Sequence, residues 1–300
     1  MKNLFGILIV GLIFITPQIS LAEINIFACE PEWKALAEEI GGSKIKAFSA
    51  TNSKQNPHYL RARPSLIIKA RNADMIFCSG AELEVGWLPI LLDTGSHKIQ
   101  SGEIGHLLAA DYVPVIEKHK GPLDRSMGDI HSEGNPHVHL NPHNIILVAN
   151  EFTRRLKLID KDNAIFYQNQ LEDFKLRWLK GIFKWEKEAS SLKGSKVIVY
   201  HKTFSYLFNW LGIETVASIE RKPGIAPTIK DLANLAIISK DSSVKFITRA
   251  VHEPKDASIW LSNKTGIKVI VLPMTVEENS EYSNLFTLYD HLLNLIKREK

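Results

Sequence analysis

The sequence predicts an α/β protein with two doubly wound lobes that are joined by one long backbone helix. Two observations lead to this fold class. In both halves of the chain, short apolar runs alternate with segments of helical period, which is typical of parallel sheets covered by helices. Between the halves, residues 160–190 keep a helical period for about eight turns, and neither Gly nor Pro interrupts it before Gly181.

The first half of the chain contains three predicted strands. Apolar runs at residues 24–28, 45–48 and 74–78 predict buried strands, and the segments at residues 32–40 and 64–71 have helical spacing. Strands and helices that alternate in this order form a parallel sheet. Such a sheet binds ligands outside the carboxyl ends of its strands.

The second half repeats this alternation. Residues 101–135 show little periodicity and predict a loop-rich stretch, after which Asn141 and Pro142 mark the start of a helix. Predicted strands follow at residues 196–200, 215–218, 245–248 and 268–272, and predicted helices lie at residues 142–156, 203–211, 228–239, 257–265 and 285–297.

Residues 1–22 have the pattern of a cleavable secretory signal peptide. Lys2 supplies a positive charge, an apolar run follows, Pro17 breaks it, and small residues precede an expected cleavage before Glu23. The apolar run is short for a bilayer span, which argues against a membrane anchor. We therefore expect an exported protein. Its expected parts are an N-terminal lobe at residues 23–157, a linking helix at residues 158–192 and a C-terminal lobe at residues 193–300.

The charge and the cysteines narrow the class of protein further. The net charge of +4 comes without a dense run of Lys or Arg, so no nucleic-acid partner is expected. Cys29 and Cys78 each end a predicted strand. In an oxidising compartment we expect them to form a disulfide if the two strands are neighbours, and two free buried thiols are the alternative.

Three of the eleven histidines stand where α/β lobes present ligands. His58 follows the second predicted strand, His137 precedes a helix and His201 directly follows the strand at residues 196–200. Imidazole nitrogens are common zinc ligands. The sequence thus predicts a site for a divalent transition metal, zinc first, in the cleft between the lobes. A local site that combines His137 with His139 and His143 is disfavoured, because Pro142 interrupts any shared regular element.

Four stretches of the chain carry a family resemblance. They are Asn56-Pro57-His58 with Arg63-Pro64-Ser65, Ala73-Asp74 with Gly80 and residues 82–88, residues 135–142 (NPHVHLNP), and residues 199–206 (VYHKTFSY). Together they resemble the zinc- and manganese-binding solute receptors of ABC importers, the cluster A-I or ZnuA/TroA-like group. The match runs over nearly the whole chain after residue 22.

The resemblance implies a periplasmic receptor that performs no catalysis. It implies a monomer that delivers Zn²⁺ to a cognate permease and its ATPase in the inner membrane. It also implies that His58, His137 and His201 are the ligands. Mn²⁺-binding members usually carry Glu at the third position, so His201 favours zinc. Many members add a carboxylate from the C-terminal lobe. For this fourth ligand we expect Glu281 first, Glu278 second, and water otherwise.

Two departures from the family pattern leave roles open. His139 replaces a residue that is usually aromatic. In the loop-rich stretch, only His106, His119 and His131 stand where many zinc-binding members carry a longer His-rich loop, so these residues either capture metal weakly or belong to a plain exposed loop. The rival functions are a manganese or iron receptor on the same scaffold, an exported zinc-dependent hydrolase, and a zinc buffer or adhesin without a transporter.

Overall fold

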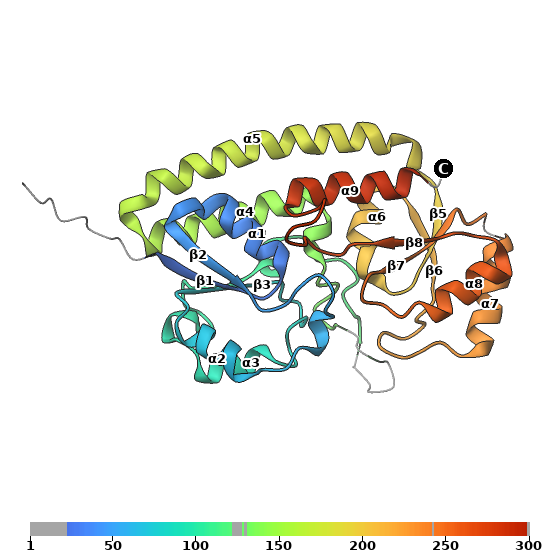
Figure 1. Cartoon of the computed structure of the whole chain (residues 1–300), viewed down its shortest axis with the longest axis horizontal. Coiled ribbons are helices and arrows are strands. Elements are labelled where there is room, and N and C mark those ends of the chain that lie inside the picture. The colour runs from blue at the N-terminus through green and yellow to red at the C-terminus, as the bar shows by residue number, and fades with distance from the viewer. Residues whose placement is uncertain (1–22, 122–127, 129–130, 242, 299–300) are drawn as a thin grey trace, which may run out of the picture.

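The computed structural model describes residues 23–121, 128, 131–241 and 243–298 (Figure 1). The expected signal peptide therefore lies outside the described residues. Within these ranges, no helix is both long enough and apolar enough to cross a membrane.

The N-terminal lobe is built on a parallel sheet of four strands. These are β1 (Ile24–Ala28), β2 (Ile45–Ser49), β3 (Met75–Cys78) and β4 (His106–Leu108), in the order β2-β1-β3-β4. Strand β4 lies in the stretch that the sequence predicted as loop. It has three residues, too few to produce a recognisable pattern.

Helices cover both faces of this sheet, because successive side chains of a strand point to opposite sides. Phe77 packs with α1 (Pro31–Gly41) and α4 (Pro142–Ile159), whereas its neighbour Ile76 packs with α2 (Pro64–Arg71) and α3 (Leu88–Thr94). In Figure 1, α1 and α4 lie above the sheet, and α2 and α3 lie below it. The central strands β1 and β3 are therefore largely buried, whereas the edge strands β2 and β4 are only partly buried.

The C-terminal lobe repeats this arrangement. Its parallel strands are β5 (Lys196–Val199), β6 (Glu214–Ser218), β7 (Phe246–Ala250) and β8 (Val269–Leu272), in the order β6-β5-β7-β8. One face of the sheet packs against α6 (Ser205–Leu211) and α9 (Leu285–Lys297), and the other against α7 (Ile229–Asp241) and α8 (Asp256–Thr265).

The long helix α5 (Ala164–Ala189) runs along both lobes (Figure 1), which confirms the predicted fold class. It packs against α1 and α4 of the first lobe and against α9 of the second. Trp178 is central to this packing. Its ring lies 5.1 Å from Trp185 and 5.4 Å from Tyr289 between centroids, and its indole N–H donates to the Pro142 carbonyl oxygen at 2.8 Å.

The two cysteines form the predicted disulfide. Cys29 follows β1 and Cys78 ends β3, and these strands are neighbours, so the Cα atoms lie 4.8 Å apart. Both residues are fully buried. The bond thus fastens the two central strands of the first sheet where they approach the other lobe.

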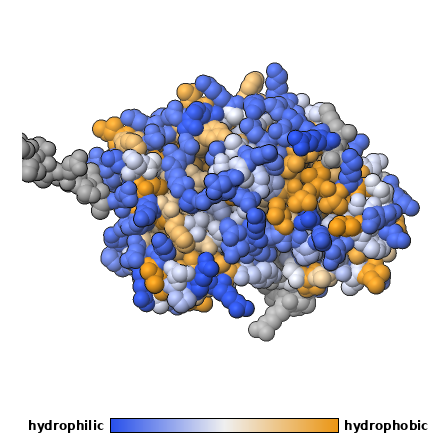
Figure 2. All heavy atoms as spheres, in the orientation of Figure 1, coloured by the Kyte–Doolittle hydropathy of each residue, from blue (hydrophilic) through white to orange (hydrophobic). Residues whose placement is uncertain are grey.

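The outer face of the protein is mostly hydrophilic in the view of Figure 2. Hydrophobic side chains are scattered over it, and the largest group visible there lies over the C-terminal lobe.

Candidate metal centre

The three histidines predicted from the sequence come together between the lobes. His58, His137 and His201 each offer a ring nitrogen within 4.8 Å of the other two. Ligand nitrogens of a tetrahedral zinc site lie about 3.4 Å apart, since each bond is about 2.0–2.1 Å long. A small inward movement of the rings would therefore close the set around one ion. A cavity of about 330 Å³ adjoins all three.

The two histidines of the first lobe owe their placement to the same tripeptide. In Asn56-Pro57-His58 and in Asn135-Pro136-His137, the Asn side chain accepts a hydrogen bond from the backbone N–H of the His at 3.0 Å. Proline fixes the residue between them, so each tripeptide is a tight turn that presents its imidazole.

A third copy of this tripeptide, Asn141-Pro142-His143, forms the same hydrogen bond at 3.0 Å. Its histidine is 54% exposed, however, and lies 3.2 Å from Glu186 on the surface. The turn therefore fixes the backbone around the histidine. The rest of the fold decides whether its imidazole faces the cluster or the surface. The disfavoured local site around His143 does not form.

The loop that carries His137 is fastened to the C-terminal lobe. The Asn135 side chain donates to the Lys202 carbonyl oxygen at 2.8 Å, and Tyr206 Oη donates to the Asn135 carbonyl oxygen at 2.9 Å. Gly134 precedes this loop at φ +105°, and a Cβ there would lie 2.5 Å from Val115. Only glycine fits such a position. These contacts hold the His137 loop of the first lobe beside the segment of the second lobe that carries His201.

His201 lies two residues after the end of β5 and is oriented by a carboxylate. Its Nδ1 lies 3.0 Å from Glu220 Oε2, and Glu220 follows the neighbouring strand β6. This contact leaves Nε2 of His201 for the centre of the cluster, in the manner of the carboxylate–histidine pairs that support metal ligands. His252, which follows β7, lines the same cavity.

Burial and neighbouring charges favour the neutral form of His58, His137 and His252. Burial lowers the pKa of His58 and of His137 well below the ordinary 6.5, and the charges of neighbouring histidines lower both pKa values further. Burial likewise lowers the pKa of His252 to about 4. Among the described residues, the buried Nδ1 atoms of His137 and His252 have no hydrogen-bond partner. Neutral imidazole is the form that binds metal.

The histidines of the loop-rich stretch divide among three surroundings. His131 stacks beside His58 with 4.9 Å between ring centroids, and Glu82 holds the adjacent Ser132 by its hydroxyl at 2.8 Å. His119 lines a second cavity next to the cluster. His106 belongs to β4, and its Nδ1 lies 2.8 Å from the Ile99 carbonyl oxygen.

The expected fourth ligand from the C-terminal segment does not join the cluster. Glu281 is 86% exposed and lies 3.4 Å from His291, and Glu278 pairs with Lys34 of α1 at 2.8 Å. The segment after β8 turns toward α1 and β2, where Lys54 also holds Glu277 at 3.0 Å. In this structure Glu281 thus lies apart from the histidines, and lysines of the first lobe hold the preceding acidic residues, so a fourth ligand from this segment stays a prediction.

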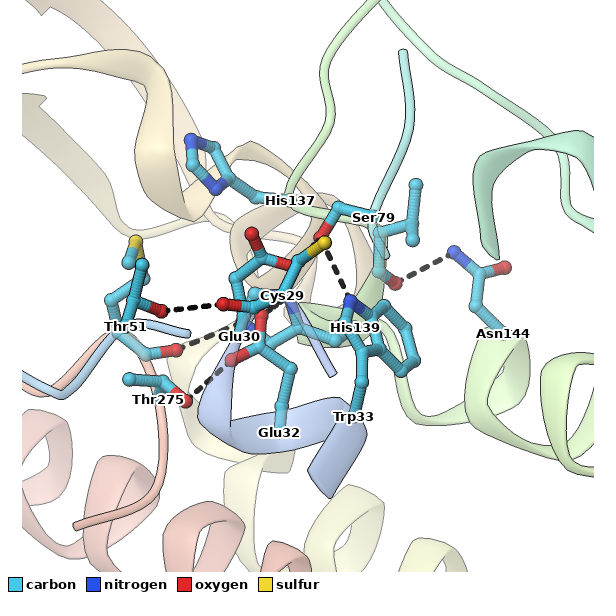
Figure 3. Close-up of polar contacts among 12 residues, drawn as sticks. Cys29, Glu30, Glu32, Trp33, Thr51, Ser79, His137, His139, Asn144 and Thr275 are labelled. Atoms are coloured by element: carbon cyan, nitrogen blue, oxygen red, sulfur yellow. Dashed lines mark hydrogen bonds and ion pairs between the residues drawn. The ribbon is translucent and has the colours of Figure 1, made fainter. Parts of the chain in front are cut away.

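His139 has a definite place beneath the cluster. Its Nε2 donates to the Met274 carbonyl oxygen at 2.9 Å, and its Nδ1 lies 3.0 Å from the Glu32 carboxylate, which also accepts from Thr275 Oγ1 at 2.5 Å. Figure 3 shows Glu32, His139 and Thr275 as one group with His137 at its edge. His139 and Glu32 are each 1% exposed. This buried pair joins α1 to the segment that follows β8.

Two more carboxylates are buried beside the disulfide. Glu84 accepts from the backbone N–H groups of Ser79 and Gly80 at 2.7 and 3.1 Å, and Glu30 accepts from the Ser79 hydroxyl at 3.3 Å. Burial raises the pKa of Glu84 to about 7, and burial together with the Glu84 charge raises the pKa of Glu30 well above its ordinary value. Both cysteine sulfurs are bonded to each other, so neither is a free thiolate that could bind a metal beside Glu84.

Fold and site together define a class: a two-lobed α/β protein with a candidate metal centre between its lobes. Comparison with known proteins makes the class specific. Residues 26–299 match the family described as ZnuA, zinc-uptake complex component A, periplasmic. The chain belongs to this family.

Curated relatives include proteins named for different metals. The zinc-binding lipoprotein AdcA of Streptococcus pneumoniae is 23% identical over 274 residues, which are 87% of this chain and 52% of AdcA. The manganese ABC transporter substrate-binding lipoprotein PsaA of Streptococcus anginosus is 27% identical over 276 residues, which are 87% of this chain and 84% of PsaA. The chain spans about half the length of the first of these relatives.

Solved structures share the fold. The crystal structure of ZnuA aligns with a TM-score of 0.74 at 19% identity, covering 91% of this chain and 99% of that one. The cadmium-bound periplasmic metal-binding protein of Candidatus Liberibacter asiaticus aligns with a TM-score of 0.74 at 14% identity, covering 93% and 100%.

Proposed function

We propose that this protein is the periplasmic receptor of an ABC importer and that it captures Zn²⁺ through His58, His137 and His201. One observation carries the proposal: imidazoles from both lobes converge, with one ring nitrogen of each within 4.8 Å of the others. Membership of the ZnuA family supports it. The protein then acts by binding and delivery, as a monomer that docks on a membrane permease whose ATPase drives release.

The donor set favours zinc over manganese. Three nitrogen ligands suit zinc, whereas manganese prefers carboxylate and carbonyl oxygens. Among the described residues, no carboxylate joins the three histidines within ligand distance of one another. A tetrahedral zinc ion bound here would keep one position for water or for a ligand that arrives with it. Relatives named for manganese make Mn²⁺ the second candidate, and competitive titration with both metals separates the two.

The same reasoning weighs against a zinc hydrolase. Such an enzyme needs a general base beside the metal-bound water. Glu220, a carboxylate of the cavity lining, is already engaged with Nδ1 of His201 and accepts from the Gly224 N–H at 3.3 Å. It is therefore suited to orienting a ligand.

The tripeptide repeat offers a matched control for testing the site. We expect His58→Ala, His137→Ala and His201→Ala each to weaken zinc binding by at least about 100-fold, since even residues that merely support ligands are worth 10- to 100-fold. His143→Ala removes a histidine held in the same turn but exposed at the surface, and should bind zinc like the wild type. Calorimetric titration of the apoprotein measures all four. Unchanged affinity in the three ligand variants would refute the site.

A further inference from the structure

A second cavity, of about 460 Å³, shares His137 and His201 with the histidine cluster. Its lining is strongly basic. The positive side chains are Lys118, Lys120, Lys202 and Arg221, and they are accompanied by His119 and His131. Glu117 is the single carboxylate among the described lining residues.

Three of these cations are adjacent in the chain to residues that organise the cluster. Lys202 directly follows the proposed ligand His201, and Arg221 directly follows Glu220, which orients His201. Lys118 follows Glu117 in a segment that is anchored to the His137 loop, because Asn135 N–H donates to the Ile116 carbonyl oxygen at 2.9 Å. The positive charge is thus placed beside the histidines by the same contacts that place the histidines.

The one carboxylate does not neutralise this lining. Glu117 already accepts from Asn135 Nδ2 at 3.0 Å and from Ser205 Oγ at 3.2 Å, and it pairs with Lys202 at 3.4 Å. Arg221 is 80% exposed and lies 3.6 Å from Asp231. Within the described part of the chain, Lys118 and Lys120 lie within ion-pair distance of no acidic side chain.

A basic cavity disfavours a bare divalent cation and favours an anion. A zinc ion carried by a tricarboxylate has a net charge of minus one, so the same field that repels the free ion attracts the chelate. Three imidazoles also leave one coordination position that an exogenous carboxylate oxygen can fill. The positive charge of the cavity lining and the fourth coordination position of the ion therefore both favour an anionic ligand that accompanies the metal.

We propose that this basic cavity binds the anion of a metal chelate, a small di- or tricarboxylate that completes the coordination of the ion. Its remaining carboxylates would pair with Lys118, Lys120 and Arg221. This inference rests on the proposed function and specifies the form in which the cargo arrives. The protein would accept zinc together with its carrier, without first stripping it.

Zinc citrate is the probe. Native mass spectrometry of the wild-type protein with zinc citrate should show one zinc and one citrate retained together. The double charge reversal K118E/K120E should lose the citrate, and its capture of zinc citrate should slow about tenfold or more, within the range of electrostatic steering. Its affinity for aquo zinc should not weaken. The matched control K180E/K187E makes the same charge change on exposed positions of α5 and should behave like the wild type.

Two results would overturn the inference. One is a wild-type protein that takes zinc from citrate and retains no citrate. The other is citrate retention that K118E/K120E leaves unchanged, or that occurs equally in the apoprotein without zinc. In both cases zinc would still bind to the histidines. Failure of the wild-type protein to bind aquo zinc would instead contradict the proposed function, so the two failures are distinguishable.

Discussion

The two sheets have the same strand order, yet the carboxyl ends of their central strands are used in opposite ways. In the first lobe, the ends of β1 and β3 carry Cys29, Glu30 and Cys78, which are fully buried around a disulfide. In the second lobe, the ends of β5 and β7 carry His201 and His252, which face a cavity.

The shared topology thus places functional side chains at the carboxyl ends of the central strands in both lobes. It does not determine whether those side chains are buried or face a cavity. The first lobe closes its strand ends and presents its histidines on Asn-Pro-His turns. The second lobe keeps its strand ends open and presents His201 directly. We call the buried strand ends of the first lobe the closed side and the cavity-facing strand ends of the second lobe the open side. The following predictions test whether the closed side contributes to stability and the open side to metal binding.

The largest expected effect is on the buried His139–Glu32 pair of the first lobe, which contacts Met274 and Thr275 of the second. His139→Phe leaves the buried Glu32 carboxylate without its imidazole partner, although Thr275 Oγ1 still donates to it. Breaking a buried pair in this way should lower the free energy of unfolding by about 3–5 kcal/mol. Urea denaturation of the apoprotein measures it. The double variant H139F/E32L should recover much of the loss, and a loss below about 1 kcal/mol in H139F alone would contradict a stabilising pair.

Removal of the disulfide should come next. Cys29 and Cys78 are 49 residues apart, and the loop entropy of such a link corresponds to about 4 kcal/mol at most, with 2–4 kcal/mol typical. We expect C29A/C78A to unfold at lower urea while zinc affinity stays near the wild-type value. A large loss of zinc affinity in the folded variant would show that the closed side also shapes the binding site.

Glu84→Gln should change how stability depends on pH. The pKa of Glu84 is about 7 in the folded protein against an ordinary 4.5. As pH rises through this window, the unfolded chain loses its proton first, so the wild-type protein loses stability. The variant has no such proton to lose, and its melting temperature in a metal chelator should fall less between about pH 5 and pH 7.5 than that of the wild type. Parallel curves for the two proteins would contradict the raised pKa.

The smallest effect concerns the open side. The pKa of His252 is about 4 when folded against an ordinary 6.5, so stability is present above pH 6.5 and is lost as pH falls toward 4. His252→Asn should therefore retain more of its stability near about pH 5 than the wild-type apoprotein. Zinc affinity should change by less than about threefold, under about 1 kcal/mol. A larger loss would place His252 among the ligands.

Local sequence pattern predicted the fold class and the convergence of the three histidines, and it predicted the disulfide on the condition that its two strands are neighbours. Alternating apolar runs predict parallel strands, and a residue just after such a strand lies at a known edge of the sheet. Glu220 and His252 have this same signal, since each follows a strand closely. They were missed because their distance to His201 depends on the order of strands within the sheet, which local pattern does not encode.

The position of Glu281 in the fold could not be predicted for a related reason. The choice of Glu281 relied on an acidic stretch near the final helix, but the direction of that stretch is decided by Lys34 and Lys54, which are more than 200 residues away in the chain. The role of His139 likewise depends on Glu32 and on the Met274 carbonyl oxygen, which meet it only in the folded protein.

The long helix α5 has a mechanical consequence. It spans both lobes without a break and is clamped by stacked aromatic rings, among them Trp185 against Tyr289 of α9 at 4.8 Å between centroids. The helix is continuous over its 26 residues, so it links the two lobes without an interruption in its backbone hydrogen bonding. Separating the lobes therefore requires either bending α5 or breaking its aromatic contacts with α9. If the proposed permease docks on both lobes, it would act on both ends of this one helix when it separates them.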